Sequence, residues 1–163
     1  MMSQKNIISH PWERIIFKSS ITVLILSGLA QMPLFKRYYI ADFPGFAWTA
    51  DYHFNHVLHY IAAAVMLFIT AKWALTYTKK RKNKIRLSIS GSIRVSLFLI
   101  IIISGFFRAV KNLPEFYFSP VTTTAIIWIH LAAGAILGII ALYARLAGKN
   151  YTTSFKSKAD FPA

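Results

Sequence analysis

Residues 97–107 read LFLIIIISGFF, an apolar run without a charged side chain. A bilayer whose hydrocarbon core is about 30 Å thick is crossed by a helix of roughly 20 mostly apolar residues. The chain holds four stretches that reach or approach this length, at about 15–34, 54–76, 94–111 and 122–146. The third reaches it through Arg94 and Lys111, whose long side chains are expected to extend to the lipid head groups. The sequence therefore predicts an all-α membrane protein, a single bundle of four transmembrane helices over residues 1–163.

The composition excludes several classes of protein. Hydrophobic residues make up 56% of the 163 residues, yet 19 Lys and Arg stand against 5 Asp and Glu, for a formal net charge of +14. A disordered basic segment would hold far fewer hydrophobic residues, and a soluble nucleic-acid binder would not carry long apolar runs. We therefore expect the lipid membrane, and no nucleic acid, as a partner. The chain has no cysteine, which excludes disulfides, iron–sulfur clusters held by this chain and covalent attachment of c-type haem.

The positions of Lys and Arg predict the orientation, because cytoplasmic segments carry the excess of these residues. Of the 19 basic residues, 15 lie in the N-terminal segment, near the connection between the second and third helices, or in the C-terminal tail. The other four are Lys36, Arg37, Arg108 and Lys111. Both termini are therefore expected in the cytoplasm, with residues 148–163 as a loose tail.

Aromatic side chains gather in two segments that this topology places on the outer face, residues 38–53 and 114–120. Two interpretations stay open. The rings form a belt at the membrane interface, or they form a docking surface for an extramembrane partner.

The five histidines differ in their expected depth. His10 precedes the first span, His53, His56 and His59 open the second, and His130 lies inside the fourth. An ionisable side chain inside a bilayer is costly and is therefore a functional candidate by default. At 1.5 Å per residue, His59 lies roughly 8 Å and His130 roughly 12 Å below the outer ends of their spans.

Small residues lie near both deep histidines or at the same level of the other spans, namely Gly28, Ala62, Ala63, Gly105, Ala133 and Gly134. They are typical of close helix packing, and they also leave room for a flat macrocycle. Two histidines at one level favour the second interpretation, a b-type haem whose iron is held by His59 and His130. His56 is an alternative ligand or a contact of a haem propionate, and Arg108 is either a propionate contact or an interfacial anchor. No metal other than the haem iron is expected.

With these residues identified, the chain resembles the membrane cytochrome b family that includes the gamma subunit of formate dehydrogenase and the cytochrome b subunits of nickel–iron hydrogenases. The resemblance is carried by Arg14-Ile-Ile-Phe17, Leu26-Ser-Gly28, Asn55-His-Val-Leu-His59 and Trp128-Ile-His130-Leu-Ala-Ala-Gly134. It implies a multi-pass protein of a prokaryotic cytoplasmic (inner) membrane that carries out electron transport in a respiratory chain. Its partners would be the quinone pool and a periplasmic redox subunit, which is a multihaem cytochrome, an iron–sulfur subunit or a catalytic subunit. The chain would then be a subunit of an oxidoreductase complex rather than a complete enzyme.

The resemblance also implies that one haem site has been lost. Members with two haems hold the inner one through a histidine three residues after an arginine in the first span and a second histidine late in the fourth. Phe17, Tyr143 and Ala144 stand at these places. One haem b is therefore expected, with a quinone as substrate. The residues available to exchange protons with it are Asp51, His53, Glu13 and His10.

A second hypothesis is a membrane anchor or assembly subunit of a respiratory complex that binds no haem. A transporter is less favoured, because the middle of each predicted span lacks acidic residues.

Overall fold

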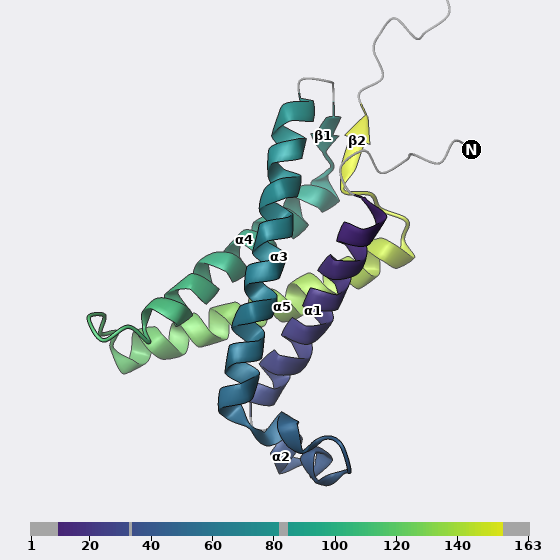
Figure 1. Cartoon of the computed structure of the whole chain (residues 1–163). Helices are drawn as coiled ribbons and strands as arrows, with labels where there is room; N and C mark the ends of the chain where they lie inside the picture. The colour runs from purple at the N-terminus through teal and green to yellow at the C-terminus, as the bar shows by residue number, and fades with distance from the viewer. Residues whose placement is uncertain (1–9, 33, 82–84, 155–163) are drawn as a thin grey trace, which may run out of the picture. The chain divides into compact units, whose positions relative to one another are not determined.

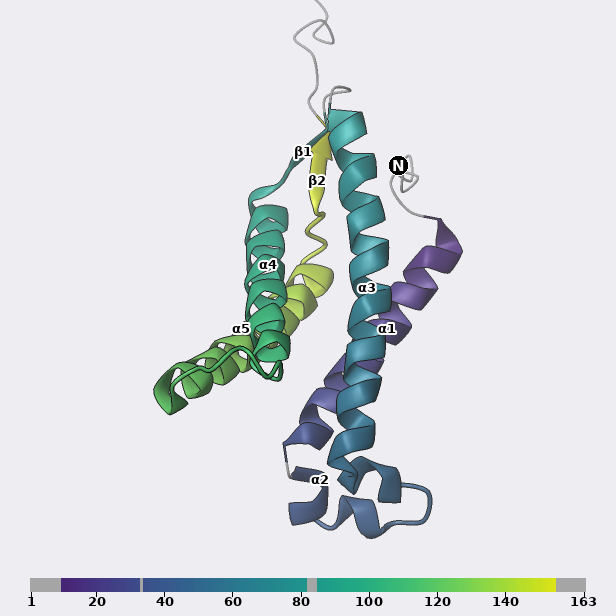
Figure 2. The ribbon, with the colours of Figure 1, turned by 60° about the vertical axis from the view of Figure 1, so that its left-hand side comes forward.

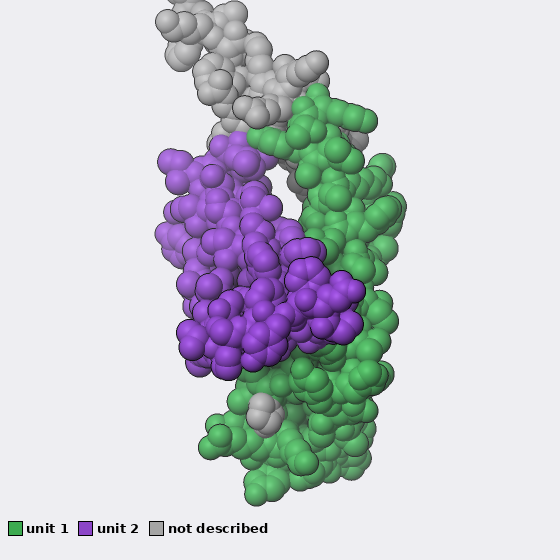
Figure 3. All heavy atoms as spheres, turned by 90° about the vertical axis from the view of Figure 1, so that its left-hand side faces the viewer, with its two compact units in different colours: residues 1–80 green, residues 81–163 purple. Residues whose placement is uncertain are grey.

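The computed structural model describes residues 10–32, 34–81 and 85–154 (Figures 1 and 2). The chain divides into two compact units, Met1–Lys80 and Arg81–Ala163, which are green and purple in Figure 3. Each unit is built around one antiparallel pair of long helices.

The first unit consists of α1 (Pro11–Gln31), the short helix α2 (Leu34–Arg37), two 3-10 turns, η1 (Ile40–Asp42) and η2 (Ala47–Ala50), and α3 (Tyr52–Arg81). Helix α1 begins with Pro11, and the Glu13 side chain accepts a hydrogen bond from the backbone N–H of His10 at 3.3 Å. It ends at Gln31, because Pro33 disfavours the helical conformation at Met32, where ψ is 137°. The predicted span 15–34 therefore extends past the observed end of the helix.

Helices α1 and α3 run antiparallel (Figures 1 and 2), and side-chain hydrogen bonds join them near both ends of α1. Near its start, Glu13 binds Lys72 and Trp73 of α3. Near its end, Ser27 binds His59. The register of the two helices is thus set by polar contacts inside a largely apolar pair.

Asn55 connects the aromatic segment of the first unit to α3. Its side chain is fully buried and its amide donates to the carbonyl oxygens of Trp48 at 2.8 Å and Asp51 at 2.7 Å. The Asp51 carboxylate accepts from the backbone N–H of Phe54 at 2.9 Å and so caps the first turn of α3. The chain between α1 and α3 is therefore held against the start of α3.

The second unit consists of β1 (Ile85–Leu87), α4 (Ile89–Val110), α5 (Pro120–Leu146) and β2 (Thr152–Ser154). The two strands pair antiparallel, with Arg86 opposite Thr153. Serine caps begin both helices, since the Ser88 and Ser119 side chains accept from the backbone N–H groups of Gly91 and Thr122. These caps explain why α4 and α5 begin before the predicted starts at 94 and 122. Helix α3 likewise begins before the predicted start at 54, after its Asp51 cap.

The segment after α5 returns to the start of α4. Arg94 is only 5% exposed, donates to the carbonyl oxygens of Ser90 and Lys149, and lies 3.5 Å from the ring centroid of Tyr151. A Cβ at Gly91 would lie 2.1 Å from the carbonyl oxygen of Tyr151, so this approach requires glycine. The prediction that Arg94 extends to the head groups is therefore wrong, because its guanidinium is covered by this segment.

The prediction of a loose tail over residues 148–163 did not anticipate strand β2. Residues 152–154 pair with β1, whereas 155–163 lie outside the described residues. This two-stranded ribbon is also the one departure from an all-helical fold in the part of the chain that the structure describes.

In the described residues, three helical segments are long and apolar enough to cross a membrane: Tyr52–Lys79, Ile89–Val110 and Pro120–Leu146. By these helices the chain is a multi-pass membrane protein. Helix α1 is not among them, and its first turns carry Glu13, Arg14 and Lys18. The four-span count and the cytoplasmic position of both termini stay predictions.

Candidate functional site

Each unit holds one of the two deep histidines against a serine of the neighbouring helix. In the first unit, the Nδ1 atom of His59 on α3 lies 3.0 Å from Oγ of Ser27 on α1. Ser27 is fully buried, and its hydroxyl also donates to the carbonyl oxygen of Val23 at 2.7 Å. The residue after the serine is Gly28, where an added Cβ would lie 3.5 Å from Cε1 of His59. We call Ser27, Gly28 and His59 the His59 site.

The second unit repeats this arrangement on different helices. Nδ1 of His130 on α5 lies 3.0 Å from Oγ of Ser104 on α4 and 3.1 Å from the carbonyl oxygen of Ile101. The Ser104 hydroxyl donates to the carbonyl oxygen of Ile100 at 2.7 Å. A Cβ on Gly105 would lie 3.1 Å from Cε1 of His130, which is tighter than most real contacts. We call Ser104, Gly105 and His130 the His130 site.

The two sites therefore share one plan, in which Ser-Gly comes from the first helix of a pair and histidine from the second. Both histidines and both glycines are candidates from the sequence, whereas the role of the two serines appears only in the structure. A sequence signal was present, because Ser-Gly follows an apolar run at both 27–28 and 104–105. The role of each Ser-Gly pair follows only from the histidine that lies opposite its serine.

The other small residues selected from the sequence have different surroundings. Ala62 and Ala133, each three residues after a histidine, are buried, whereas Ala63 is half-buried. Among the described residues, a Cβ added at Gly134 would meet no atom within 4 Å outside its own helix backbone. The face of α5 beside His130 thus has open space at this position.

His56 has a different environment from His59. Its Nδ1 lies 3.3 Å from Oε1 of Gln31, and its ring lies between Tyr52 and Tyr60, with centroid distances of 5.6 and 4.4 Å. His56 thus packs between two aromatic rings of its own helix, and its Nδ1 contact to α1 is with an amide oxygen, whereas that of His59 is with a serine hydroxyl. This difference favours His59 over His56 as the residue that matches His130.

Arg108 belongs to the surroundings of the His130 site. It lies four residues after Ser104, on the same face of α4, and is half-buried. This position, one turn after the serine that contacts His130, puts a cation on the side of α4 that faces α5. A cation beside His130 suits an anionic group bound in the same place.

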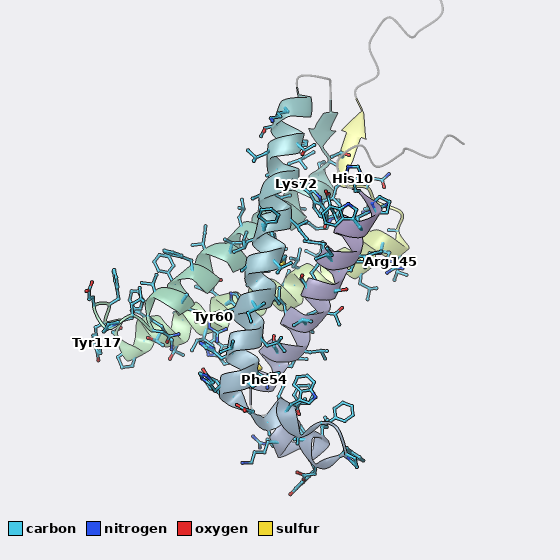
Figure 4. All side chains as sticks on the ribbon, in the orientation of Figure 1. His10, Phe54, Tyr60, Lys72, Tyr117 and Arg145 are labelled. Carbon is cyan, nitrogen blue, oxygen red and sulfur yellow. The ribbon has the colours of Figure 1, made fainter. Side chains whose placement is uncertain are left out.

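A buried carboxylate lies at the opposite end of the first unit, where Figure 4 shows His10 and Lys72 close together. Glu13 is 1% exposed and precedes the apolar segment that begins at Ile15. It accepts from the Lys72 ammonium, from the Trp73 indole N–H at 2.8 Å and from the backbone of His10. These donors, Lys72 first, lower the pKa of Glu13 to about 2, so it is ionised at neutral pH.

The four residues proposed for proton exchange are divided between the two ends of the first unit. Glu13 and His10 lie at one end. Asp51 and His53 lie at the other, near Phe54 in Figure 4, and both are exposed. Asp51 already serves as the cap of α3. In the described part of the chain, no group of three or more His, Asp or Glu side chains is close enough to bind a metal ion.

Comparison with known proteins gives no match to a family model, to a curated protein or to a solved structure. The two histidine sites, the buried Glu13 cluster and the long apolar helices are the features that a function has to explain.

Proposed function

We propose that this chain is a b-type haem subunit of a membrane oxidoreductase, which relays electrons between the quinone pool and a redox partner on the periplasmic side. The observation that carries the proposal is the shared plan of the His59 and His130 sites. Each of the two units contributes one imidazole from an apolar helix, in the same local environment. Two neutral imidazoles are the ligand set of a six-coordinate, low-spin haem suited to electron transfer.

The residues present fit such a group. The chain offers no thiolate, so nitrogen ligands are required, and both histidines lie within membrane-length helices. The residues one turn after the histidines are small, at Ala62, Ala133 and Gly134, and the open space at Gly134 favours a flat macrocycle beside the His130 ring. Bound haem would supply reversible one-electron chemistry of its iron. Arg108 would hold a propionate, and His56 would be an alternative contact for one.

The surroundings of Phe17 support a single haem. The resemblance to the cytochrome b family puts Phe17 at the position of the first ligand of the inner haem, and its ring centroid lies 4.8 Å from that of Trp73. Near the end of α5, Tyr143 and Ala144 offer no imidazole. Packing between aromatic rings thus occupies the place of the first ligand.

The proposal includes α1 as a fourth span with both termini in the cytoplasm, in a prokaryotic inner membrane. The excess of Lys and Arg supports this orientation. The Glu13–Lys72 pair lies at the cytoplasmic end in this topology, where it neutralises two charges near the membrane. The periplasmic partner would dock on the aromatic segments, where Tyr39 is 72% and Tyr117 is 90% exposed. The residues that exchange protons with the quinone depend on the end of the first unit at which the quinone binds. They are Glu13 and His10 at one end, or Asp51 and His53 at the other.

The first test is a reduced-minus-oxidised visible spectrum of the full chain purified with its native partners, together with a pyridine haemochromogen assay. One b-type haem per chain is expected. His59→Ala and His130→Ala should each abolish its spectrum, whereas His10→Ala, at the far end of α1, should leave it unchanged. Two haems per chain would contradict the single site. A haem-free preparation that retains its partners would overturn the proposal in favour of a haem-free membrane anchor.

A further inference from the structure

The geometry points to Ser27 and Ser104 as positioning residues that hold the proton of each imidazole on Nδ1, direct Nε2 toward the haem iron and lower the potential of that haem. The inference rests on the proposed function, since it assigns roles around the same two ligands. It adds two residues that act through the histidines and a reason why each serine is followed by glycine.

The position of the proton on His130 follows from its two neighbours. The carbonyl oxygen of Ile101, 3.1 Å from Nδ1, can only accept a hydrogen bond. Nδ1 must therefore carry the hydrogen in that contact. Ser104 lies 3.0 Å away and gives its own hydrogen to the carbonyl oxygen of Ile100 at 2.7 Å. The Ser104 oxygen therefore also accepts a hydrogen bond from Nδ1 of His130. Because the neutral ring carries one N–H, at Nδ1, its lone pair lies on Nε2.

His59 has the same kind of serine contact at Nδ1. The Ser27 hydroxyl has one hydrogen, and the carbonyl oxygen of Val23 at 2.7 Å is a closer acceptor than Nδ1 at 3.0 Å. Once that hydrogen is given to Val23, Ser27 accepts from His59. Nδ1 is again protonated and Nε2 is the nitrogen with the lone pair.

The glycines allow each ring to approach the helix that carries its serine. A Cβ at Gly28 would contact Cε1 of His59 at 3.5 Å, and one at Gly105 would press on Cε1 of His130 at 3.1 Å. Cε1 lies between the two ring nitrogens. Because glycine has no Cβ, each ring can lie this close to the neighbouring helix, where the serine bonds to its Nδ1.

A hydrogen bond donated by Nδ1 makes an imidazole a stronger electron donor through Nε2, which stabilises ferric over ferrous iron. Removing the acceptor should raise the midpoint potential. His130 keeps the Ile101 carbonyl as an acceptor when Ser104 is removed, so its ring should stay protonated on Nδ1 in that variant. Ser27→Ala and Ser104→Ala should each raise the potential, and the double variant should raise it most.

The experiment is a spectroelectrochemical titration of the full chain with its partners, comparing these variants with Ser20→Ala and Ser96→Ala. Ser20 is a buried serine of α1 and Ser96 an exposed one of α4, and in the described residues neither is hydrogen-bonded to a histidine. Their potentials should equal that of the unchanged protein. If the serines had only a structural role, their replacement would alter stability and haem content but would leave the midpoint potential of the bound haem unchanged.

A second measurement does not depend on haem. In the haem-free protein labelled with ¹⁵N-histidine, nitrogen chemical shifts distinguish a ring protonated on Nδ1 from one protonated on Nε2. The signals of the two sites are assigned by their loss in His59→Ala and His130→Ala. Both rings should be protonated on Nδ1. If Ser27→Ala binds haem too weakly for a titration, a change of His59 toward the Nε2-protonated form supports the inference, and an unchanged ring overturns it.

The remaining outcomes separate the two proposals. Haem in the unchanged protein, with both serine variants at the control potential, overturns the positioning role and leaves the haem subunit standing. Absence of haem from the complex overturns the proposed function. If the complex contains no haem, the nitrogen shifts still test the role of the serines. Rings protonated on Nε2 would overturn that role, and rings protonated on Nδ1 would support it.

Discussion

Replacing Gly105 and Gly28 by alanine in parallel tests the packing of the two histidine sites. The new Cβ would lie 3.1 Å from Cε1 of His130 in the first variant and 3.5 Å from Cε1 of His59 in the second. Ordinary contacts begin at 3.4 Å, so Gly28→Ala is accommodated, whereas Gly105→Ala forces the His130 ring to shift by a few tenths of an ångström.

The free energies involved can be compared directly. Both substitutions gain about 1 kcal/mol of helix propensity, and this gain cancels in the comparison. Overpacking costs about 1–3 kcal/mol. The ring of His130 moves away from α4, so the cost includes weakening of the bonds from Nδ1 to Ser104 and Ile101. Gly105→Ala should therefore be less stable than Gly28→Ala by about 1–3 kcal/mol.

The measurement is reversible unfolding in mixed micelles, followed by circular dichroism as the fraction of denaturing detergent increases. Haem content of the two variants is measured at the same time, and Gly105→Ala should bind less. Equal stabilities within about 0.5 kcal/mol would refute the reasoning, because the close approach of His130 to α4 would then carry no steric cost.

Three further predictions concern other parts of the fold. Gly91→Ala should destabilise the second unit by about 1–3 kcal/mol, seen as faster proteolysis after α5, since the new Cβ meets the backbone of Tyr151 at 2.1 Å; an unchanged cleavage rate would contradict this contact. Glu13→Gln should lower the thermal unfolding temperature at pH 7 and flatten its pH dependence. With a folded-state pKa of about 2 against an ordinary 4.5, the carboxylate of Glu13 stabilises the fold above pH 4.5, and this contribution is lost as the pH falls toward 2; a parallel pH profile for the variant would contradict the ion pair with Lys72. His56→Ala should retain the haem spectrum that His59→Ala loses, and a lost spectrum would make His56 the ligand.

The helices could be predicted from the sequence because their signals are local. Apolar length indicated all four long helices, and Pro120 marks the start of α5, two residues before the predicted boundary. The strand pair could not be predicted in this way. Each strand has three residues and lies more than sixty residues from its partner, so no window of sequence contains the pairing. Arg94 was misassigned for the same reason, since the Tyr151 ring that covers it comes from the far end of the unit.

The histidines of the site could be selected from the sequence because an imidazole inside an apolar helix is unusual by itself. Their serine partners could not, because a serine within a membrane helix commonly bonds to the carbonyl four residues earlier. Ser27 and Ser104 do form that bond. Their second role appears only when the register between the two helices of each pair is known.

In the first unit, that register is determined by the Glu13 cluster. Glu13 and Ser27 are separated by fourteen residues of α1, or about 21 Å of helix. A slip of α1 by one turn against α3 would separate Ser27 from His59 and, at the same time, withdraw Glu13 from Lys72 and Trp73. The Glu13 carboxylate would then lose the Lys72 ammonium and the Trp73 indole N–H, the two donors that most lower its pKa, which is unfavourable. The ion pair at one end of the unit thus maintains the height at which His59 meets its serine at the other.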